Sequence, residues 1–399
     1  MTAVAPPAPG ADELLARAEE FVPLLVERQA ETEDATMYAA DLHERFAEAG
    51  LYRVLTPRVF GGLELGAEAF FRVVMTLARG CPSTAWMYTF AHAHALAAAT
   101  LFGREAQEEL FASPDFLCPA TVAPAGIATP VPGGWRVSGT FGYCSGSPYA
   151  THFMGHTLVV GPDGPPTPLL FVLPRASWRR LDDWGNSLGL RGSGSHSVVV
   201  DDAFVPAHHA LGLHLSQTAV TEDTPGRLLH AGPEYAGGPL SFMLLQLGAL
   251  AAGMARGALD AYAELMRVRT TSFPPIVSRA EDPGFQFRYG EAAGMVAAAE
   301  SAVLGAVRTW HDTCVTGPSA FTREHELSLA LTSREAIRLS WRAVESHLFP
   351  TAGSSSVRSG ERVERVWRDM STLHSHAGPG TFLSTLAPRE LARSHFGLA

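Results

Sequence analysis

The first quarter of the chain carries apolar side chains at helical spacing. One stripe covers residues 14–25 and a second covers 38–46, with charged residues between the apolar positions. The second stripe stops at Gly50, a residue type that commonly ends helices. Two further helices are expected over 67–79 and 83–102. These patterns predict an N-terminal helical domain over residues 11–115.

The pattern changes near residue 116, where Pro and Gly begin to punctuate short β-prone runs. The clearest strands are expected over 135–141, 156–160, 169–173 and 197–200. Strands at this density are typical of a compact barrel or sandwich. The segment 116–207 is therefore predicted to form a central β-domain.

Long helical patterns return after a loop-like segment. They cover 240–269, 283–313 and 322–348, with Pro350 ending the third, and a last helix is expected over 360–376. Long antiparallel helices with apolar stripes form bundles. The chain is therefore predicted to have an α+β fold: a helical domain, a β-barrel or sandwich, and a four-helix bundle over 240–399.

Composition narrows the range of partners. The chain has 399 residues, 46% of them apolar, which is enough for the cores of two or three domains. Its net charge is −10 and no basic run occurs, so neither nucleic acid nor an anionic membrane surface is an expected partner. Lysine is absent, which excludes lysine Schiff-base chemistry and a Walker-type phosphate loop.

Cysteine spacing and the apolar segments indicate a cytoplasmic protein. The four cysteines are far apart and form no CxxC pair, so neither a disulfide framework nor a cysteine-based zinc site is indicated. The longest apolar segment, 242–255, is interrupted by Gln246 and is too short to span a bilayer. The N-terminus lacks the pattern of a signal peptide. We therefore expect a cytoplasmic location and no membrane partner.

One glycine cluster resembles a nucleotide site only superficially. Gly189, Gly192 and Gly194 lie close together, but they lie between β-prone runs with no helix after them. A dinucleotide fingerprint needs a strand, the glycine turn and a helix. If the protein uses flavin, the electrons must therefore come from the substrate or from flavin that is reduced elsewhere.

Several motifs resemble the acyl-CoA dehydrogenase family. They are Arg368-Asp369 followed by His374-Ser375-His376, and Leu188–Ser195 followed by Phe204-Val205-Pro206. One lineage of these dehydrogenases places its catalytic carboxylate eight residues after the Arg–Asp pair, where this chain has Ala377. The sequence therefore resembles the group D flavin-dependent monooxygenases, the two-component hydroxylases built on the same fold.

The resemblance implies an activity and its partners. It implies the oxygenase component of a two-component system, which hydroxylates an aromatic or polyketide-like small molecule through a flavin C4a-hydroperoxide. Molecular oxygen would be the co-substrate, and reduced FMN or FAD would come from a separate NAD(P)H flavin reductase. A homotetramer is the oligomeric state that the family implies.

The resemblance also implies roles for three catalytic residues. Ser145 would hydrogen-bond near flavin N5, His376 would face the flavin peroxide, and His94 would orient or deprotonate the substrate. His94 lies eight residues after Trp86, which would share the substrate side with it. An imidazole that titrates near neutrality suits proton transfer of this kind.

His92 and His374 are the alternatives on the substrate side. Each lies two residues from the favoured histidine, so on a helix the members of a pair point about 200° apart. At most one histidine of each pair is then expected to line the pocket. The same spacing suits metal binding poorly, because two metal ligands on one helix usually lie three or four residues apart. His208-His209 lies in a loop without an acidic partner in a recognisable motif. No metal site is therefore expected.

Five further positions are candidates for flavin binding. The resemblance implies that Trp184 packs near the isoalloxazine and that Arg191 contacts flavin or a neighbouring subunit. It places Arg269 near the flavin phosphate, and Gly353 and Ser354 around phosphate or ribityl groups. A core tryptophan, a structural ion pair and an ordinary loop are the alternatives for Trp184, Arg191 and the glycine loop. The Phe-Gly motif expected after Arg269 is missing, which leaves FMN versus FAD open.

Three other functions remain open at this point. The same scaffold could oxygenate the nitrogen of an amine or amino sugar. It could be an acyl-CoA dehydrogenase whose carboxylate lies elsewhere, for instance Glu264 on the first bundle helix. It could also be a flavin-free binding or assembly protein.

Overall fold

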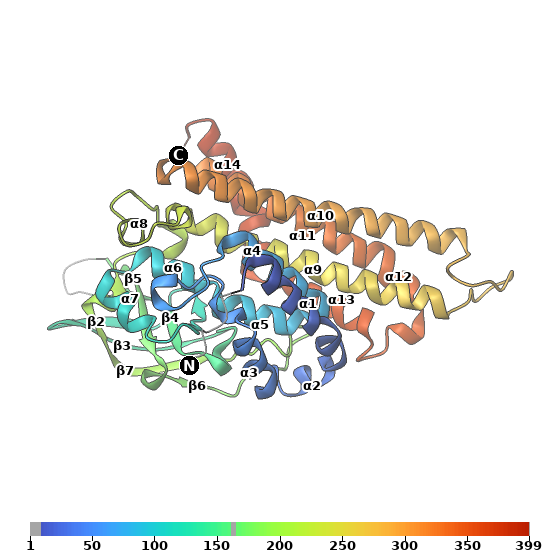
Figure 1. The fold of residues 1–399 in the computed structure, drawn as a ribbon, viewed down its shortest axis with the longest axis horizontal. Helices are drawn as coiled ribbons and strands as arrows, with labels where there is room; N and C mark the ends of the chain where they lie inside the picture. Colours follow the sequence, from blue (N-terminus) through green and yellow to red (C-terminus); the bar gives the residue numbers. More distant parts are fainter. Residues whose placement is uncertain (1–8, 161–164, 399) are drawn as a thin grey trace, which may run out of the picture.

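The structure of the chain, a computed structural model, describes residues 9–160 and 165–398. Helices form its N-terminal part, strands its middle and long helices its C-terminal part, which confirms the predicted α+β fold. Figure 1 shows the sheet at one end of the molecule and the long helices running away from it, with the N-terminal helices packed along them.

The N-terminal part is helical, as the apolar stripes predict. Its helices are α1 (Ala11–Glu27), α2 (Gln29–Asp34), α3 (Ala40–Glu48), α4 (Gly66–Gly80), α5 (Pro82–His92), α6 (His94–Leu101) and α7 (Arg104–Leu110). Gly50 follows α3 in the left-handed conformation (φ 82°), as a glycine beyond a helix end commonly does. The helix predicted over 83–102 is divided at Ala93, whose backbone stays near helical values, so α5 and α6 continue one another.

The middle of the chain forms one curled eight-stranded sheet in the described residues, which confirms the predicted central β-domain. Its strands are β1 (Ala120–Thr121), β2 (Ile127–Val131), β3 (Gly134–Phe141), β4 (His152–Val159), β5 (Thr167–Pro174), β6 (Arg179–Arg180), β7 (Val198–Pro206) and β8 (Ala210–Leu211). The order is β6-β7-β3-β2-β4-β5-β8, with β1 beside β4. Buried Phe141, Phe153 and Phe171 pack edge to face on one side of this sheet.

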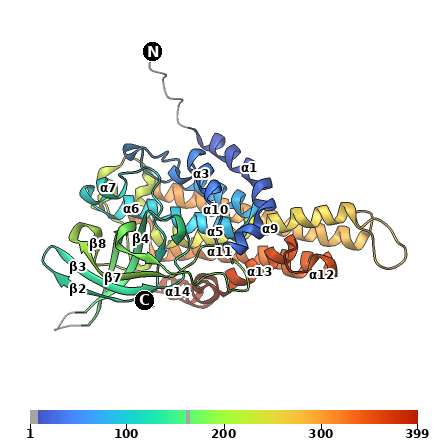
Figure 2. The same ribbon diagram turned by 90° about the horizontal axis from the view of Figure 1, so that it is seen from below.

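The C-terminal part is a helical bundle built around one buried helix. Short α8 (Pro225–Leu229) precedes α9 (Pro239–Val268), α10 (Pro283–Thr316), α11 (Arg323–Arg342) and α13 (Arg362–Ser375). Helix α9 contacts α10, α11 and α13, and also α4 of the N-terminal part. In Figure 2 the far ends of α9 and α10 project beyond the rest of the chain.

One predicted helix end is wrong, and one helical segment was not predicted. Helix α11 continues through a π-helical stretch (Ala343–Leu348) into α12 (Phe349–Ala352), so Pro350 does not end it. Pro350 lies in the first turn of α12, where its missing N–H is tolerated, and Gly353 (φ 93°) follows the last turn. Helix α13 ends at Ser375, close to the predicted end, but after His376 the chain becomes helical again in a π-helical stretch (Gly378–Leu386) and α14 (Ala387–His395), which were not predicted.

Helices α9 and α10 are long and apolar enough to cross a membrane, judged by length and composition alone. The most apolar window of α9 is 89% buried inside the protein, which is what the core helix of a bundle requires. The corresponding window of α10 is only 33% buried. One side of α10 therefore presents apolar residues outward.

Candidate active site

Four hydroxyl and indole groups form a chain of hydrogen bonds between α5 and two loops of the sheet. The Trp86 indole N–H donates to Ser145 Oγ at 3.0 Å, and Ser145 Oγ lies 2.8 Å from Ser195 Oγ. Ser193 Oγ extends the chain, 2.7 Å from Ser195 Oγ. The structure thus joins predicted residues Trp86 and Ser145, and it adds two serines from the glycine-rich segment before β7.

A glycine brings these groups together. Gly146 has φ 91°, and a Cβ atom there would lie 2.8 Å from Ala91 Cβ and 2.9 Å from the Met87 carbonyl oxygen. Only a residue without a side chain lets the loop after β3 approach α5 this closely. The Gly146 N–H also donates to the Gly194 carbonyl, which ties this loop to the loop of Ser195.

His376 packs against the same part of α5. Its ring is perpendicular to the Trp86 ring at 5.5 Å between centroids and roughly parallel to the Phe90 ring at 6.4 Å. Helix α13 ends at Ser375, and His376 has extended backbone angles. The helix end therefore turns the His376 ring towards α5.

The hydrogen bond of His376 defines which nitrogen carries the proton. The Gly378 N–H donates to His376 Nδ1 at 3.1 Å, so the neutral ring carries its proton on Nε2. The residue is exposed at the surface, but Trp86 and Phe90 pack against its ring, and the partial desolvation lowers its pKa. Near neutral pH the ring is uncharged, and Nε2–H is a hydrogen-bond donor.

Trp86, Phe90 and His94 lie on one face of the continuous α5–α6 helix, four residues apart. His94 lines a small cavity of about 30 Å³. Its other lining side chains are mostly apolar and include Leu96, Leu215, Phe242, Met243, Gln246 and Trp310. A cavity of this size holds about two waters, far less than the 300 Å³ or more of a typical ligand pocket. An aromatic ligand therefore requires side chains here to move.

His94 is buried and uncharged. Its Nδ1 lies 3.0 Å from the Phe90 carbonyl oxygen, which can only accept, so Nδ1 carries the proton and Nε2 is left as an acceptor. Burial lowers the pKa of His94 to about 4. His94 therefore remains neutral down to mildly acidic pH.

The structure does not bring His92 or His374 to this group. His92 is fully buried on the other side of α5, where its Nε2 accepts a hydrogen bond from the Leu55 N–H at 3.3 Å. His374 packs on the Trp341 ring of α11 at 5.0 Å. Both therefore belong to packing contacts of the scaffold, and the prediction that one histidine of each pair points away agrees with their placement.

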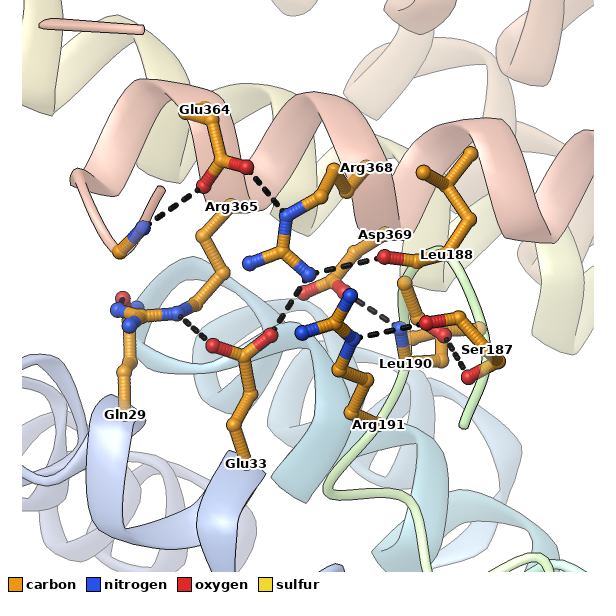
Figure 3. Close-up of polar contacts among 12 residues, drawn as sticks. Gln29, Glu33, Ser187, Leu188, Leu190, Arg191, Glu364, Arg365, Arg368 and Asp369 are labelled. Carbon is orange, nitrogen blue, oxygen red and sulfur yellow. Dashed lines mark hydrogen bonds and ion pairs between the residues drawn. The ribbon is translucent and has the colours of Figure 1, made fainter. Parts of the chain in front are cut away.

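The Arg368–Asp369 pair holds the loop before β7. Asp369 accepts a hydrogen bond from the Leu190 N–H at 2.5 Å, and the Arg368 guanidinium donates to the Leu188 carbonyl at 2.9 Å (Figure 3). A Cβ atom on Gly189 would lie 2.2 Å from the Arg368 carbonyl oxygen, so the loop needs glycine to lie against α13. Burial raises the pKa of Asp369 to about 7.

A buried ion cluster joins α13 to α2. Glu33 lies 2.8 Å from Arg365 and 2.7 Å from Arg368, and Figure 3 shows it between the two guanidinium groups. Burial alone would raise the pKa of Glu33, but hydrogen bonds from the two arginines outweigh it and lower the pKa. Because both arginines reach α2, this cluster fixes α13 relative to the N-terminal part.

Trp184 and Arg191 line a polar surface hollow of about 600 Å³. Thr36, Gly360 and Arg365 contribute to the same hollow. The Trp184 indole N–H donates to the Leu190 carbonyl at 3.0 Å, and Arg191 donates to the Ser187 carbonyl at 2.8 Å. Within the described ranges Arg191 forms no ion pair with a carboxylate. A structural ion pair therefore does not account for Arg191, and its charge is available to an anionic ligand.

Arg269, Gly353 and Ser354 lie together at the other end of α13. Arg269 donates to the Ala352 carbonyl at 3.4 Å, and a Cβ atom on Gly353 would lie 3.8 Å from Arg269 Nη1. His376 follows α13 whereas this loop precedes it, and the 14-residue helix is roughly 20 Å long. Within one chain, the structure therefore does not bring these three residues to the His376 group.

Two further acidic residues bear on predictions from sequence. Glu264 is exposed and lies 3.2 Å from Arg362 at the start of α13, so it is not poised near His376.

Glu109 of α7 lies within 3.3 Å of both His208 and His209. The interpretation that these two histidines lack an acidic partner is therefore wrong, because the partner is close in space and remote in sequence.

The chain matches two family models. The model of the acyl-CoA dehydrogenase N-terminal domain matches residues 9–114, and the model of the C-terminal domain matches residues 245–379. The oxygenase subunit HsaA of a flavin-dependent monooxygenase from Rhodococcus jostii (strain RHA1) is 31% identical over 368 residues, covering 90% of this chain and 93% of that protein. The chain belongs to the flavin-dependent monooxygenases that share the acyl-CoA dehydrogenase fold.

Two further relatives inform the chemistry of this monooxygenase. The oxygenase component of an FADH2-dependent resorcinol hydroxylase from Rhizobium sp. (strain MTP-10005) is 28% identical, covering 87% of this chain and 85% of that protein. The structure of XiaF from Streptomyces sp. in complex with FADH2 and glycerol is 25% identical with a TM-score of 0.87, covering 98% of this chain and 96% of that chain. The predicted use of reduced flavin and of a separate reductase is thereby supported.

The monooxygenase has site residues that sequence reasoning missed. Phe90 lies four residues from both Trp86 and His94, so helical periodicity alone could have found it. Gln246 was noticed only as the polar interruption of an apolar segment, and the structure places it in the lining of the cavity beside His94. Ser193 and Ser195 gave no signal beyond lying in a glycine-rich segment.

The residues present fit a flavin. The hollow of about 600 Å³ has the size of a cofactor site, with an aromatic ring and an unpaired guanidinium in its lining. Trp184 also contacts the Tyr143 ring at 6.0 Å, which places the hollow next to the loop of Ser145. Trp184 and Arg191 would hold the cofactor on this side, with Ser145 and His376 towards its reactive edge.

Proposed function

We propose that this monooxygenase hydroxylates a phenolic substrate, with His376, Ser145 and His94 as its catalytic residues. The observation that carries the proposal is the position of His376. A histidine lies against Trp86 and Phe90 in the segment where one dehydrogenase lineage has its carboxylate. When bound, reduced flavin supplies two electrons and activates dioxygen for transfer of one oxygen atom to the substrate.

Ser145 holds a proton at a defined place. Because its oxygen accepts the Trp86 indole N–H, its own hydroxyl proton is free for Ser195 or for a ligand acceptor. The surrounding group is largely buried, which strengthens such a hydrogen bond and excludes water. We assign Ser145 to the polar edge of the flavin ring.

His376 acts as a neutral hydrogen-bond donor. Its Nδ1 is occupied by the Gly378 N–H, so the ring offers Nε2–H to an oxygen atom at the site. Acting as a base would require Nδ1 to give up the Gly378 hydrogen bond and the ring to become charged, which the desolvation that lowers its pKa opposes. The role that fits is donation to the oxygen atom that leaves when the other oxygen is transferred.

His94 accepts a hydrogen bond from the substrate hydroxyl through Nε2. Moving a proton from a phenol, whose pKa is about 10, to a ring whose pKa is about 4 would cost roughly 8 kcal/mol in the free protein. Orientation of the hydroxyl is therefore the assigned role, rather than full deprotonation. The Gln246 amide, which also lines the cavity, supplies a second polar anchor.

The substrate needs room that the cavity gains by side-chain movement. Met243 lines the cavity on the α9 side, and its unbranched side chain changes rotamer readily. On the same helix, Leu247 lies against Gly378, next to His376. The segment from Met243 to Leu247 thus runs from the His94 cavity to the His376 loop, which makes it the wall along which a planar substrate would lie.

The test is a reconstituted reaction. The purified chain would be supplied with NADH, a flavin reductase, FMN or FAD, oxygen enriched in ¹⁸O and a panel of simple phenols. The proposal expects a hydroxylated product carrying one ¹⁸O atom. Absence of product across the panel, together with bleaching of oxidised flavin by an acyl-CoA under anaerobic conditions, would favour the dehydrogenase.

We further propose a cytoplasmic homotetramer. The apolar outer side of α10 and the exposed Phe273, Ile276 and Phe287 near the tip of α9 and α10 support burial between copies of the chain. Assembly would also give the loop of Arg269 and Gly353 a flavin to contact in a neighbouring subunit. Light scattering after size-exclusion chromatography measures the mass directly, and a monomer would contradict this proposal.

A further inference from the structure

Three side chains with metal-binding atoms meet where α7 lies against the turn that follows β7. Glu109 Oε2 of α7 is 3.3 Å from His208 Nε2 and 3.0 Å from His209 Nε2, and the ligand atoms of all three residues lie within 4.8 Å of one another. The two histidines are neighbours in a single 3-10 turn (Ala207–His209) between β7 and β8. The group lies outside the catalytic machinery described above.

The inner histidine is buried without a hydrogen bond. His209 is only 6% exposed, and its Nε2 has no hydrogen-bond partner among the described residues, although Glu109 Oε2 lies 3.0 Å away. The contact is short but lacks the alignment of a hydrogen bond. A buried nitrogen left in this state costs about 1–3 kcal/mol, which a bound ligand would relieve.

The two nitrogen–oxygen distances are close to the edge lengths of a metal polyhedron. Zinc binds imidazole nitrogen and carboxylate oxygen at about 2.0–2.2 Å in tetrahedral geometry, which places neighbouring ligand atoms about 3.3–3.5 Å apart. The two observed nitrogen–oxygen separations are 3.0 and 3.3 Å. A cation between the three side chains would also need the two imidazole nitrogens, which lie within 4.8 Å of each other, to take up a similar separation.

We propose that Glu109, His208 and His209 form a binding site for a divalent transition-metal cation of the zinc class, with solvent completing its coordination. Two imidazoles and one carboxylate suit zinc and its neighbours in the transition series, whereas magnesium and calcium prefer sites made of oxygen ligands alone. Glu109 is exposed and His208 partly exposed, so the cation can enter from solvent.

The site bridges two parts of the fold. Helix α7 belongs to the N-terminal helices, and the histidine turn belongs to the sheet, so a bound cation would clamp one to the other. Because the cation binds the folded chain, it also raises stability by mass action. The inferred role is therefore structural, and hydroxylation at the distant site should not require the cation.

The test uses Zn²⁺ in competition with a chromophoric zinc indicator on the metal-free, full-length protein. The expected result is one strong site per chain with a dissociation constant in the micromolar range or below. His209→Ala and Glu109→Gln should each weaken this site at least about 10-fold, since each removes one of three ligands. The more exposed His208→Ala serves if His209→Ala fails to fold.

His395→Ala is the matched control. His395 and Glu324 form an exposed histidine–carboxylate pair at 2.9 Å without a second histidine in the described part of the chain. This variant should bind Zn²⁺ like the unaltered protein. Excess Zn²⁺ should raise the melting temperature of the unaltered protein and of His395→Ala by about 2–4 °C, but not that of the ligand variants. Binding weaker than about 100 μM, or binding unchanged in all three ligand variants, would overturn the proposal.

Discussion

Ser145 accepts a hydrogen bond from the Trp86 indole at 3.0 Å, which joins the loop after β3 to helix α5. The same helix face carries Phe90 and meets His376. Helix α5, the loop after β3 and the end of α13 are remote in sequence, and they meet around the Trp86 ring. The proposed chemistry depends on the hydroxyl group that this contact orients.

Replacing Ser145 by Ala should divert oxygen into hydrogen peroxide. The variant loses one oriented hydroxyl and leaves the Trp86 N–H unpaired, a loss of about 1–3 kcal/mol at a buried site. The fraction of reduced flavin that yields product, rather than H2O2, should fall several-fold, whereas Ser145→Thr should keep most of it. The matched control is Ser147→Ala, because Ser147 donates to the Gly194 carbonyl from the same loop. Equal loss of coupling in the control would contradict the role of Ser145.

Removing the acceptor of His94 should weaken substrate binding more than turnover. His94→Ala is expected to raise KM about 10-fold, because losing one hydrogen bond in a buried site weakens binding by about 1.4 kcal/mol. The change in kcat should be smaller. Because the pKa of His94 is about 4, KM should show no inflection from this group between pH 5.5 and 8. An inflection near pH 6.5 that disappears in His94→Ala would show that His94 titrates as an ordinary base.

Asp369 should make the protein less stable as pH rises. Its folded-state pKa is about 7, above the ordinary 3.8, so between these values the folded chain binds the proton more tightly than the unfolded chain. The free energy of unfolding should therefore fall between about pH 4 and 7, by up to about 4 kcal/mol. Buried histidines such as His94 have lowered pKa values and act in the opposite direction between pH 6.5 and 4.

Asp369→Asn isolates the contribution of the carboxyl group. The amide oxygen can still accept the Leu190 N–H, but the side chain no longer titrates. Denaturant unfolding at several pH values should show the unaltered protein losing stability relative to Asp369→Asn as pH rises from 4 to 7. A difference that stays constant over this range would contradict the raised pKa.

Arg191 should contribute to flavin affinity. Its guanidinium lines the hollow beside Trp184 and forms no ion pair with a described carboxylate, so Arg191→Ala removes a charge that an anionic cofactor can use. The dissociation constant for reduced flavin, measured anaerobically, should rise about 10-fold. Arg175→Ala is the control, because Arg175 lies over the Trp178 ring at 4.2 Å in the sheet region. Unchanged affinity in Arg191→Ala would remove Arg191 from the cofactor site.

Local patterns were enough to predict the long helices and the four longest strands, β3, β4, β5 and β7. Helical stripes and glycine positions such as Gly50 depend on neighbours along the chain, so α3, α9 and α10 could be placed closely. The end of α11 could not, because Pro350 stops a regular helix but is tolerated after a π-helical stretch. The short strand β2 also escaped, since its residues carry no strong alternation.

The site residues Trp86, His94, Ser145 and His376 were assigned through the family resemblance. Helical spacing adds only that Trp86 and His94, eight residues apart, lie on one face, and the structure keeps them there. Ser195 and Glu109 were missed because their partners lie 50 and about 100 residues away in sequence. Arg269 and Gly353 were assigned through the family resemblance, and within one chain their loop lies at the wrong end of α13 for His376.

The most direct test of the central claim compares His376→Ala with His374→Ala. Both variants remove an imidazole from the end of α13, but only His376 lies against Trp86. With reductase, reduced flavin, oxygen and a phenol that is turned over, H2O2 and product are measured per flavin oxidised. The account predicts that His376→Ala releases H2O2 in place of product while His374→Ala stays coupled. Unchanged coupling in His376→Ala, or equal uncoupling in both variants, would contradict it.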